Sequence, residues 1–426
     1  MDGESGVERM LTGLLEASHL ATFEQVPSLV AAHARQAGME EVLIYLVDLQ
    51  QRVLRLVTGH GADAGQGADA ETAELRVDGT LGGRAFQEVR VLATRGPEEA
   101  EADEAEYWWV PMLDGTERLG VLRVRTAGQG GEASVVDRMR HLASLVALML
   151  VSTRPYSDSH ARLVRTERMN VAAEMEWNLL PPLTFASEQM VIGAVAEPAY
   201  QLGGDAFDYA VAGDTVHLAV FDAMGHDVAA GITANLAMAA CRNHRRHGTP
   251  LAEASQGIEA VLLRELGPRT RFVTAIMADL DTVTGTFTWV NRGHHPPVVI
   301  RGGRWITSLA CPPSHPMGMD MGLPVIPCTE HLEPGDRVLL YTDGIIEARD
   351  RHGREFGLQR FVDFVIRHIA DGFPVPETLR RLVRTLLDHH ERPLQDDATV
   401  LLLEWHGPPS PPSSPGSVAD DHSLRP

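Results

Sequence analysis

Four aspartates in the second half of the chain stand in short glycine- or turn-rich frames that could hold divalent cations. They are Asp205 in Gly-Gly-Asp-Ala-Phe-Asp-Tyr, Asp222 in Phe-Asp-Ala-Met-Gly-His, Asp343 in Tyr-Thr-Asp-Gly and Asp396 in Gln-Asp-Asp-Ala-Thr. Mg²⁺ and Mn²⁺ prefer carboxylate oxygens supplemented by water. A water held between two such ions is activated to attack a phosphate ester. The pattern therefore indicates a hydrolytic enzyme.

Predicted strands position these aspartates. Asp222 follows an apolar run at 215–221, Asp343 follows 337–341, and Asp396 precedes 398–405. Strand ends are rigid platforms, and a glycine soon after the aspartate lets the next turn bend sharply. Asp205 follows two glycines, whose missing side chains leave room for a metal and its waters. Each motif alone is usually a turn, but four in one domain favour a metal site.

Composition limits the possible functions. The chain has 426 residues, which suggests two or three domains, and a formal net charge of −21, which disfavours nucleic acid and anionic membranes as partners. An acidic run at 97–106 is expected to be a solvated loop. The first residues are too polar for a secretory signal, and the longest apolar stretch, 141–151, is too short to span a bilayer. We expect a soluble, cytoplasmic protein.

The three cysteines are too few for a disulfide framework and are not spaced as zinc ligands. This cysteine usage, which includes Cys311 and Cys328, fits a reducing compartment. Cys241 lies in an apolar helical pattern and is expected in the core.

Residues 1–153 are predicted to form one domain. Helical patterns at 7–20 and 25–37 precede strands at 41–49 and 53–58, a hairpin with an Asp-Gly turn at 108–125, and a closing helix at 141–151. The stretches 78–86, 110–113 and 119–124 resemble a GAF domain. That resemblance implies a sensor for an unknown small ligand or partner. No cysteine lies in this region, so covalent bilin attachment or a cysteine switch is not expected there.

Residues 154–186 are expected to form a linker helix that Pro181 and Pro182 terminate. Its apolar positions are spaced at four and seven residues, so they form one stripe: Val164, Val171, Met175 and Leu179. The helix could be a plain connector. We favour a signalling helix that pairs across a homodimer and carries a signal from the sensor toward Asp205.

Residues 187–406 are predicted to form an α+β domain of two stacked antiparallel sheets flanked by helices. The hairpin at 272–291 exemplifies the antiparallel pairing. The whole chain is thus of mixed α/β class. Residues 407–426 are rich in proline and serine and are expected to be disordered.

Residues 170–405 resemble the SpoIIE/RsbU branch of the PPM-type serine/threonine phosphatases. Besides the four aspartate motifs, the resemblance rests on residues 172–175, 179–181, 291–297, 318, 323 and 332–336. It implies that Asp222 bridges two Mn²⁺ or Mg²⁺ ions, joined by the carbonyl of Ala223, and that Asp205, Asp343 and Asp396 complete the ligand set. Asp222 and Asp205 are the implied catalytic residues, and Asp397 stands just outside the ligands.

The resemblance also implies direct hydrolysis of phosphoserine or phosphothreonine, with a phosphorylated STAS-type anti-sigma factor antagonist as substrate. Alanine at 223 replaces the usual glycine or valine. We find no counterpart of the arginine that grips phosphate in the wider superfamily, which predicts weak affinity for small phosphoesters. His226, His294 and His295 could donate a proton to the leaving group, but we favour a structural role for them.

Two other functions are considered. A nucleotide cyclase would have Gly-Gly-Asp-Glu-Phe, but Ala206 replaces its second acidic residue and the motifs of Asp343 and Asp396 would go unexplained. A catalytically silent, phosphatase-fold binding module should lack metal ligands, and all four candidates are present.

Overall fold

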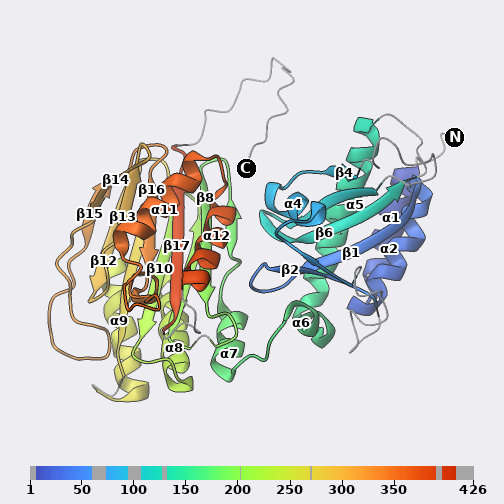
Figure 1. The fold of residues 1–426 in the computed structure, drawn as a ribbon. Helices are drawn as coiled ribbons and strands as arrows, with labels where there is room; N and C mark the ends of the chain where they lie inside the picture. The colour runs from blue at the N-terminus through green and yellow to red at the C-terminus, as the bar shows by residue number, and fades with distance from the viewer. Residues whose placement is uncertain are drawn as a thin grey trace. The chain divides into compact units, whose positions relative to one another are not determined.

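The computed structural model describes residues 6–59, 73–94, 107–126, 132–201, 203–268, 271–389 and 396–408. The chain divides into two compact units, Met1–Arg168 and Met169–Pro426, each with its own apolar core (Figure 1). Within the described ranges, no helix combines the length and the apolar character that crossing a bilayer requires. The acidic run at 97–106 and residues 409–426 of the predicted tail lie outside the described residues.

The N-terminal unit is built on one antiparallel six-stranded sheet, in the order β3-β2-β1-β6-β5-β4. Side chains of α1, α2 and α5 pack on one face in a core that includes Met10, Phe23 and Leu142. Phe86 of α4 packs with Tyr45 in a smaller cluster on the other face. The mixed α/β architecture expected here is confirmed, whereas its assignment to the GAF class stays a prediction. The elements are α1 (Gly6–Ser18), η1 (Phe23–Gln25), α2 (Val26–Ala34), η2 (Arg35–Ala37), β1 (Met39–Val47), β2 (Val53–Leu56), β3 (Glu74–Arg76), α4 (Leu81–Glu88), β4 (Leu92–Thr94), β5 (Tyr107–Asp114), β6 (Glu117–Thr126), α5 (Glu132–Thr153), η4 (Arg154–Tyr156) and α6 (Asp158–Val164).

The prediction of one linker helix over 154–186 is wrong. The helix α6 ends at Val164 in the N-terminal unit, and α7 (Val171–Leu179) begins anew in the C-terminal unit. Asn170 starts α7 because its side chain accepts a 2.6 Å hydrogen bond from the amide of Ala173, which caps the helix. The expected stripe is thus divided between two helices.

The C-terminal unit is a sandwich of two antiparallel sheets (Figure 1). The five-stranded sheet has the order β15-β12-β11-β10-β9, and the six-stranded sheet has the order β14-β13-β16-β17-β8-β7. One apolar core lies between the sheets and includes Leu218, Ile276, Leu340 and Leu401. Helices α8 and α9 cover the outer face of the first sheet, and α11 and α12 cover that of the second. This confirms the predicted two stacked sheets flanked by helices.

Most elements of this unit were predicted, but β9 was not. The strand starts at Asp205 and carries a second acid, Asp208, which is buried and accepts hydrogen bonds from Arg242 and Arg245. The elements after α7 are β7 (Thr184–Ala186), β8 (Met190–Glu197), β9 (Asp205–Ala212), β10 (Thr215–Ala223), α8 (Val228–Arg246), α9 (Leu251–Leu266), β11 (Val273–Asp281), β12 (Thr286–Arg292), β13 (Val298–Arg301), β14 (Arg304–Ser308), β15 (Cys328–His331), β16 (Arg337–Tyr341), α10 (Asp343–Ile346), α11 (Leu358–Ala370), α12 (Val375–His389) and β17 (Ala398–Trp405).

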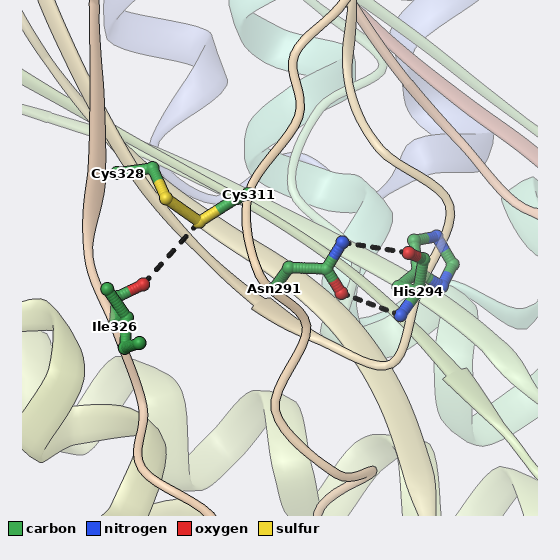
Figure 2. The surroundings of a disulfide bond; sticks show 5 residues. All are labelled: Asn291, His294, Cys311, Ile326 and Cys328. Atoms are coloured by element: carbon green, nitrogen blue, oxygen red, sulfur yellow. Dashed lines mark hydrogen bonds between the residues drawn. A yellow bond between two sulfur atoms is a disulfide. The ribbon is translucent and has the colours of Figure 1, made fainter.

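The expectation of a reducing compartment rested on the lack of a disulfide framework, yet Cys311 and Cys328 are paired. They form a disulfide that closes the segment between β14 and β15 (Figure 2). Edge strand β15 brings Cys328 to a Cα–Cα distance of 5.9 Å from Cys311, within bonding range. Cysteine usage therefore no longer supports a reducing compartment. Cys241 is a buried free thiol on α8, as predicted, and burial raises its pKa to about 12.

Candidate active site

Asp205 and Asp222 lie side by side at one end of the five-stranded sheet. They are direct partners in the antiparallel pairing of β9 with β10. Asp205 is buried, and its Oδ2 accepts a 2.5 Å hydrogen bond from the hydroxyl of Thr342, which follows β16 of the other sheet. Two of the predicted site residues are thus adjacent, and a contact from the second sheet fixes one of them.

The other two aspartates come from the six-stranded sheet. Asp343 begins the short helix α10 directly after β16, and Asp396 precedes the neighbouring strand β17. Thr342 joins the two segments, since its amide donates to the carbonyl of Thr399 and its hydroxyl accepts from the amide of Thr399. Asp343 is half-buried and Asp396 is exposed.

The glycines before Asp205 allow backbone segments to approach closely. A Cβ on Gly204 would lie 2.4 Å from the carbonyl oxygen of Gly225, so any side chain there would displace the loop after Asp222. Asp397 is buried, and its Oδ2 accepts hydrogen bonds from the amides of Gly203 (2.9 Å) and Asp205 (3.3 Å). Asp397 therefore holds the segment that presents Asp205.

The carboxylates raise one another's pKa. Burial, followed by the charges of Asp343 and Asp396, raises the pKa of Asp222 to about 7. Burial and the charge of Asp222 raise the pKa of Asp205 well above its usual range. Burial raises the pKa of Asp397 to about 6, although the amides of Gly203 and Asp205 oppose the shift. A concentration of negative charge that burial disfavours is what a bound cation would neutralise.

The donor set fits a hard divalent cation in its chemistry. Aspartate oxygens from both sheets converge on one end of the sandwich, and the mutual pKa shifts are the electrostatic sign of that proximity. Yet within the described ranges no three side chains of His, Cys, Asp or Glu are close enough together to enclose an ion. Asp205 and Asp222 are direct cross-strand partners, and Asp343 and Asp396 adjoin two neighbouring strands of the other sheet.

His294 has a structural role. Its backbone exchanges two hydrogen bonds with the side chain of Asn291, as Figure 2 shows. Its Nε2 lies 3.0 Å from the carbonyl oxygen of Tyr341 and must donate to it, so Nδ1 accepts from the hydroxyl of Thr274, 2.7 Å away. Burial lowers the pKa of His294 to about 4, so the ring is neutral near pH 7. This histidine braces the two sheets, and its one ring proton is donated to the carbonyl of Tyr341.

The other two histidines differ in their surroundings. His226 is exposed in the loop after Asp222. His295 stacks on the ring of Tyr341, with centroids 5.8 Å apart. Burial, and then the charge of Asp396, raises the pKa of Asp343, and nearby His295 opposes that rise. Of the three, His295 is the one that the structure brings to an aspartate of the site.

Three residues at the site escaped the sequence reasoning. Thr342 appeared only as part of the Asp343 motif, Thr274 lies within a strand with no motif, and Arg271 precedes that strand. Thr274 lies 3.4 Å from Oδ2 of Asp222, and Arg271 hydrogen-bonds the carbonyl of Met224 in the loop after Asp222. Only the spatial pairing of strands reveals these contacts.

Comparisons with known proteins agree with this geometry. The family model described as Stage II sporulation protein E (SpoIIE) matches residues 212–406. The match includes Asp222, Asp343 and Asp396 but begins after Asp205, whose place in the site therefore rests on its pairing with Asp222.

Two curated proteins are similar over about half of this chain. Phosphoserine phosphatase RsbU of Bacillus subtilis is 22% identical over 238 residues, which are 55% of this chain and 69% of that protein. Protein IcfG of Synechocystis is 23% identical over 258 residues, 54% of this chain and 40% of that protein.

Solved structures resemble the chain over a similar extent. The RsbU and RsbW domains of a Mycobacterium tuberculosis protein share 26% identity and cover 52% of this chain and 63% of theirs, with a TM-score of 0.45. The SiaA PP2C domain of Pseudomonas aeruginosa shares 23% identity over 50% of this chain and 85% of its own, with a TM-score of 0.45. Residues 212–406 of this chain belong to the SpoIIE family of PPM-type protein serine/threonine phosphatases.

Proposed function

We propose that the protein hydrolyses phosphoserine or phosphothreonine on a regulatory protein with the help of two divalent cations, Mn²⁺ or Mg²⁺. The observation that carries this proposal is the convergence of Asp205 and Asp222 from one sheet with Asp343 and Asp396 from the other. The SpoIIE match over three of these four residues supports it.

The chain's own residues would divide the work. Asp222, Asp205, Asp343, Asp396 and the carbonyl of Ala223 would hold the cations. Bound there, divalent cations would activate a water and offset charge on the phosphoryl and leaving oxygens. Thr342 fixes Oδ2 of Asp205, and Asp397 fixes the backbone on either side of Gly204. These contacts involve protein groups alone, so the chain itself would position part of the ligand set.

Turnover of p-nitrophenyl phosphate and of a phosphoserine peptide with Mn²⁺ tests this proposal. We expect wild-type turnover that EDTA abolishes and that Asp222→Ala lowers by at least two orders of magnitude. Asp214→Ala, in the exposed turn between β9 and β10, is the matched control and should leave turnover unchanged. Turnover that survives Asp222→Ala would remove this residue from the mechanism.

A catalytically silent binding module is the second candidate. One observation favours it, namely that no three candidate ligands among the described residues already enclose an ion. Calorimetric titration with Mn²⁺, together with turnover measurements, distinguishes the silent module from the phosphatase. Two bound ions without turnover of any phosphoprotein would support the silent module, whereas turnover would exclude it.

The substrate we propose is a phosphorylated STAS-type anti-sigma factor antagonist. Similarity to RsbU, a phosphoserine phosphatase, supports this choice. The RsbW domain that accompanies RsbU in one similar structure also points to partner-switching proteins. Incubation with candidate phosphorylated antagonists, followed by mass spectrometry, tests it. Retention of phosphate on every candidate, alongside turnover of a peptide, would refute the substrate but not the activity.

Control by the N-terminal unit is the last part of the proposal. That unit has a core of its own, as a GAF-like sensor for a small ligand would require, and α7 packs on α8 beside the site. A signal that reaches α7 could thus alter the aspartate cluster, and a homodimer through α7 is one route. Full-length protein and residues 169–426 should differ in turnover or in Mn²⁺ dependence. Equal values would argue against coupling, and light scattering tests the dimer.

A further inference from the structure

Arg271 places a guanidinium group against the loop that follows Asp222. Its Nη1 donates to the carbonyl of Met224 (3.2 Å) and to Oδ1 of Asp227 (3.3 Å), and its Nη2 donates to Oδ2 of Asp227 (3.2 Å). The side chain is 25% exposed, so it reaches solvent at the rim of the site. Among the described arginines, this is the one that hydrogen-bonds the loop.

The backbone that follows Arg271 is held by neighbouring segments. The carbonyl of Phe272 accepts a 3.1 Å hydrogen bond from the amide of Met224, and Val273 exchanges two 2.9 Å hydrogen bonds with Met317. Gly318, with φ of +100°, lies so close that a Cβ there would be 2.4 Å from the carbonyl oxygen of Arg271. The guanidinium therefore rests on a rigid support, as a preorganised binding group requires.

Asp227 accepts hydrogen bonds from only some of the N–H donors of the Arg271 guanidinium. These three contacts occupy the end of the guanidinium formed by Nη1 and Nη2. Nε–H and the neighbouring hydrogen of Nη2 have no partner among the described residues. Those two donors are parallel and match two oxygens of a phosphate group. Asp227 is itself held, because its Oδ1 also caps α8 by accepting from the amide of Ala230.

The charge of Arg271 is the next argument for phosphate binding. The sequence contains no lysine, so arginine is its only permanently cationic side chain. The aspartates of the site are negative and would repel a phosphate dianion that is not also bound by cations. An arginine at the rim can attract the phosphoryl group and orient it.

We propose that Arg271 binds the phosphoryl group of the substrate through its Nε–Nη2 edge, from the start of β11, the strand that pairs with β10 and places Thr274 opposite Asp222. This inference rests on the proposed function. The wider superfamily binds phosphate with an arginine near the beginning of the domain, and we found no counterpart there. Arg271, at the start of β11, would take that role. On this proposal, small phosphoesters should bind more tightly than the lack of an arginine near the beginning of the domain predicts.

The test is calorimetric binding of inorganic phosphate to the Mg²⁺-loaded full-length protein, with kcat and KM for p-nitrophenyl phosphate alongside. Arg271→Ala should weaken phosphate binding and raise KM by about tenfold or more, while Mg²⁺ affinity changes less than about twofold. Arg271→Lys should recover only part of the loss, because an ammonium group lacks the two parallel donors. Arg264→Ala, an exposed arginine on α9 paired with its neighbour Glu265, is the matched control and should change nothing.

Asp227→Asn separates a binding role from a structural one, since asparagine keeps the helix cap but removes the charge. This variant should bind phosphate at least as tightly as wild type. Unchanged phosphate affinity in Arg271→Ala, or an equal loss in Asp227→Asn, overturns the proposal. Wild-type protein that binds phosphate through Arg271 yet hydrolyses nothing refutes the proposed function alone. Turnover that ignores Arg271 refutes this inference alone.

Discussion

The hydroxyl of Thr342 donates to Oδ2 of Asp205 at 2.5 Å and thereby joins the two sheets of the sandwich at the candidate site. The hydroxyl oxygen of Thr342 also accepts a hydrogen bond from the amide of Thr399. One side chain therefore contacts both a site residue and strand β17. No other residue type combines a donor for the carboxylate with an acceptor for the amide at this size, apart from serine.

Thr342→Val should therefore damage both stability and metal binding. It leaves a buried carboxylate without its donor and a buried amide without its acceptor, which costs about 1–3 kcal/mol in the free energy of unfolding. Urea unfolding in EDTA measures that cost, and a Mn²⁺ titration should show weaker affinity. Thr342→Ser keeps the hydroxyl and should restore most of both. A valine variant as stable as wild type would show that the contact contributes nothing.

Glu176 on α7 is a buried carboxyl with no hydrogen-bond partner for either oxygen among the described residues. Burial, and then the charge of Asp397, raises its pKa well above 4.5. A raised folded-state pKa means that stability is lost as pH rises from the unfolded value toward the folded one.

Glu176→Gln should accordingly stabilise the metal-free protein by about 1–3 kcal/mol at pH 8 and by little near pH 4.5. Urea unfolding at the two pH values measures the difference. Glu188→Gln, at an exposed loop position, is the control and should have no such pH dependence. A glutamine variant less stable than wild type at pH 8 would mean that the carboxylate has a partner in solution.

His160 gives the N-terminal unit a pH dependence of opposite sign. Its ring packs edge-on against Phe23 with centroids 5.5 Å apart, and burial, aided by nearby arginines, lowers its pKa from 6.5 to about 4. The unfolded chain takes up the proton first, so stability present above pH 6.5 is lost as pH falls toward 4. Because the ring is half-buried, we expect an effect of about 1–2 kcal/mol.

His160→Phe keeps the aromatic contact and should remove this part of the acid sensitivity. The measurement is the change in unfolding free energy of the N-terminal unit between pH 7 and pH 5, compared between variant and wild type. An identical change in both proteins would contradict the assignment.

The disulfide between Cys311 and Cys328 predicts one free thiol, that of Cys241, in protein denatured without reductant. The double variant Cys311→Ser, Cys328→Ser should lose about 2–4 kcal/mol of stability, because the open segment gains freedom mainly in the unfolded state. Thiol counting by mass spectrometry and urea unfolding check both points. Wild-type protein with dithiothreitol should behave like the variant, and three reactive thiols in untreated protein would contradict the bond.

The sequence allowed most of the sandwich to be predicted because its strands are apolar or alternating runs between clear turns. The strands β16 and β17 begin and end at the predicted residues. The strand β9 escaped because Asp205 and Asp208 interrupt its apolar pattern, and both are buried through contacts with Thr342, Arg242 and Arg245 that no local pattern encodes.

The site shows the same division. The aspartates were found because each lies at a strand end beside a turn signal. Thr274, Thr342 and Arg271 were not, because their importance comes from cross-strand neighbours far away in sequence. The prediction of one continuous linker helix was wrong for a local reason. The side chain of Asn170 caps and so starts a second helix, where the spacing of apolar residues alone suggested a single one.

Strand β17 pairs between β16 and β8, so the last strand along the chain is inserted in the middle of its sheet, directly after Asp396 and Asp397. A chain still being synthesised therefore has its first three aspartates but neither the fourth nor the clamp on Gly203. On the proposed function, hydrolysis would therefore require that residues 396–405 are already in place in the sheet.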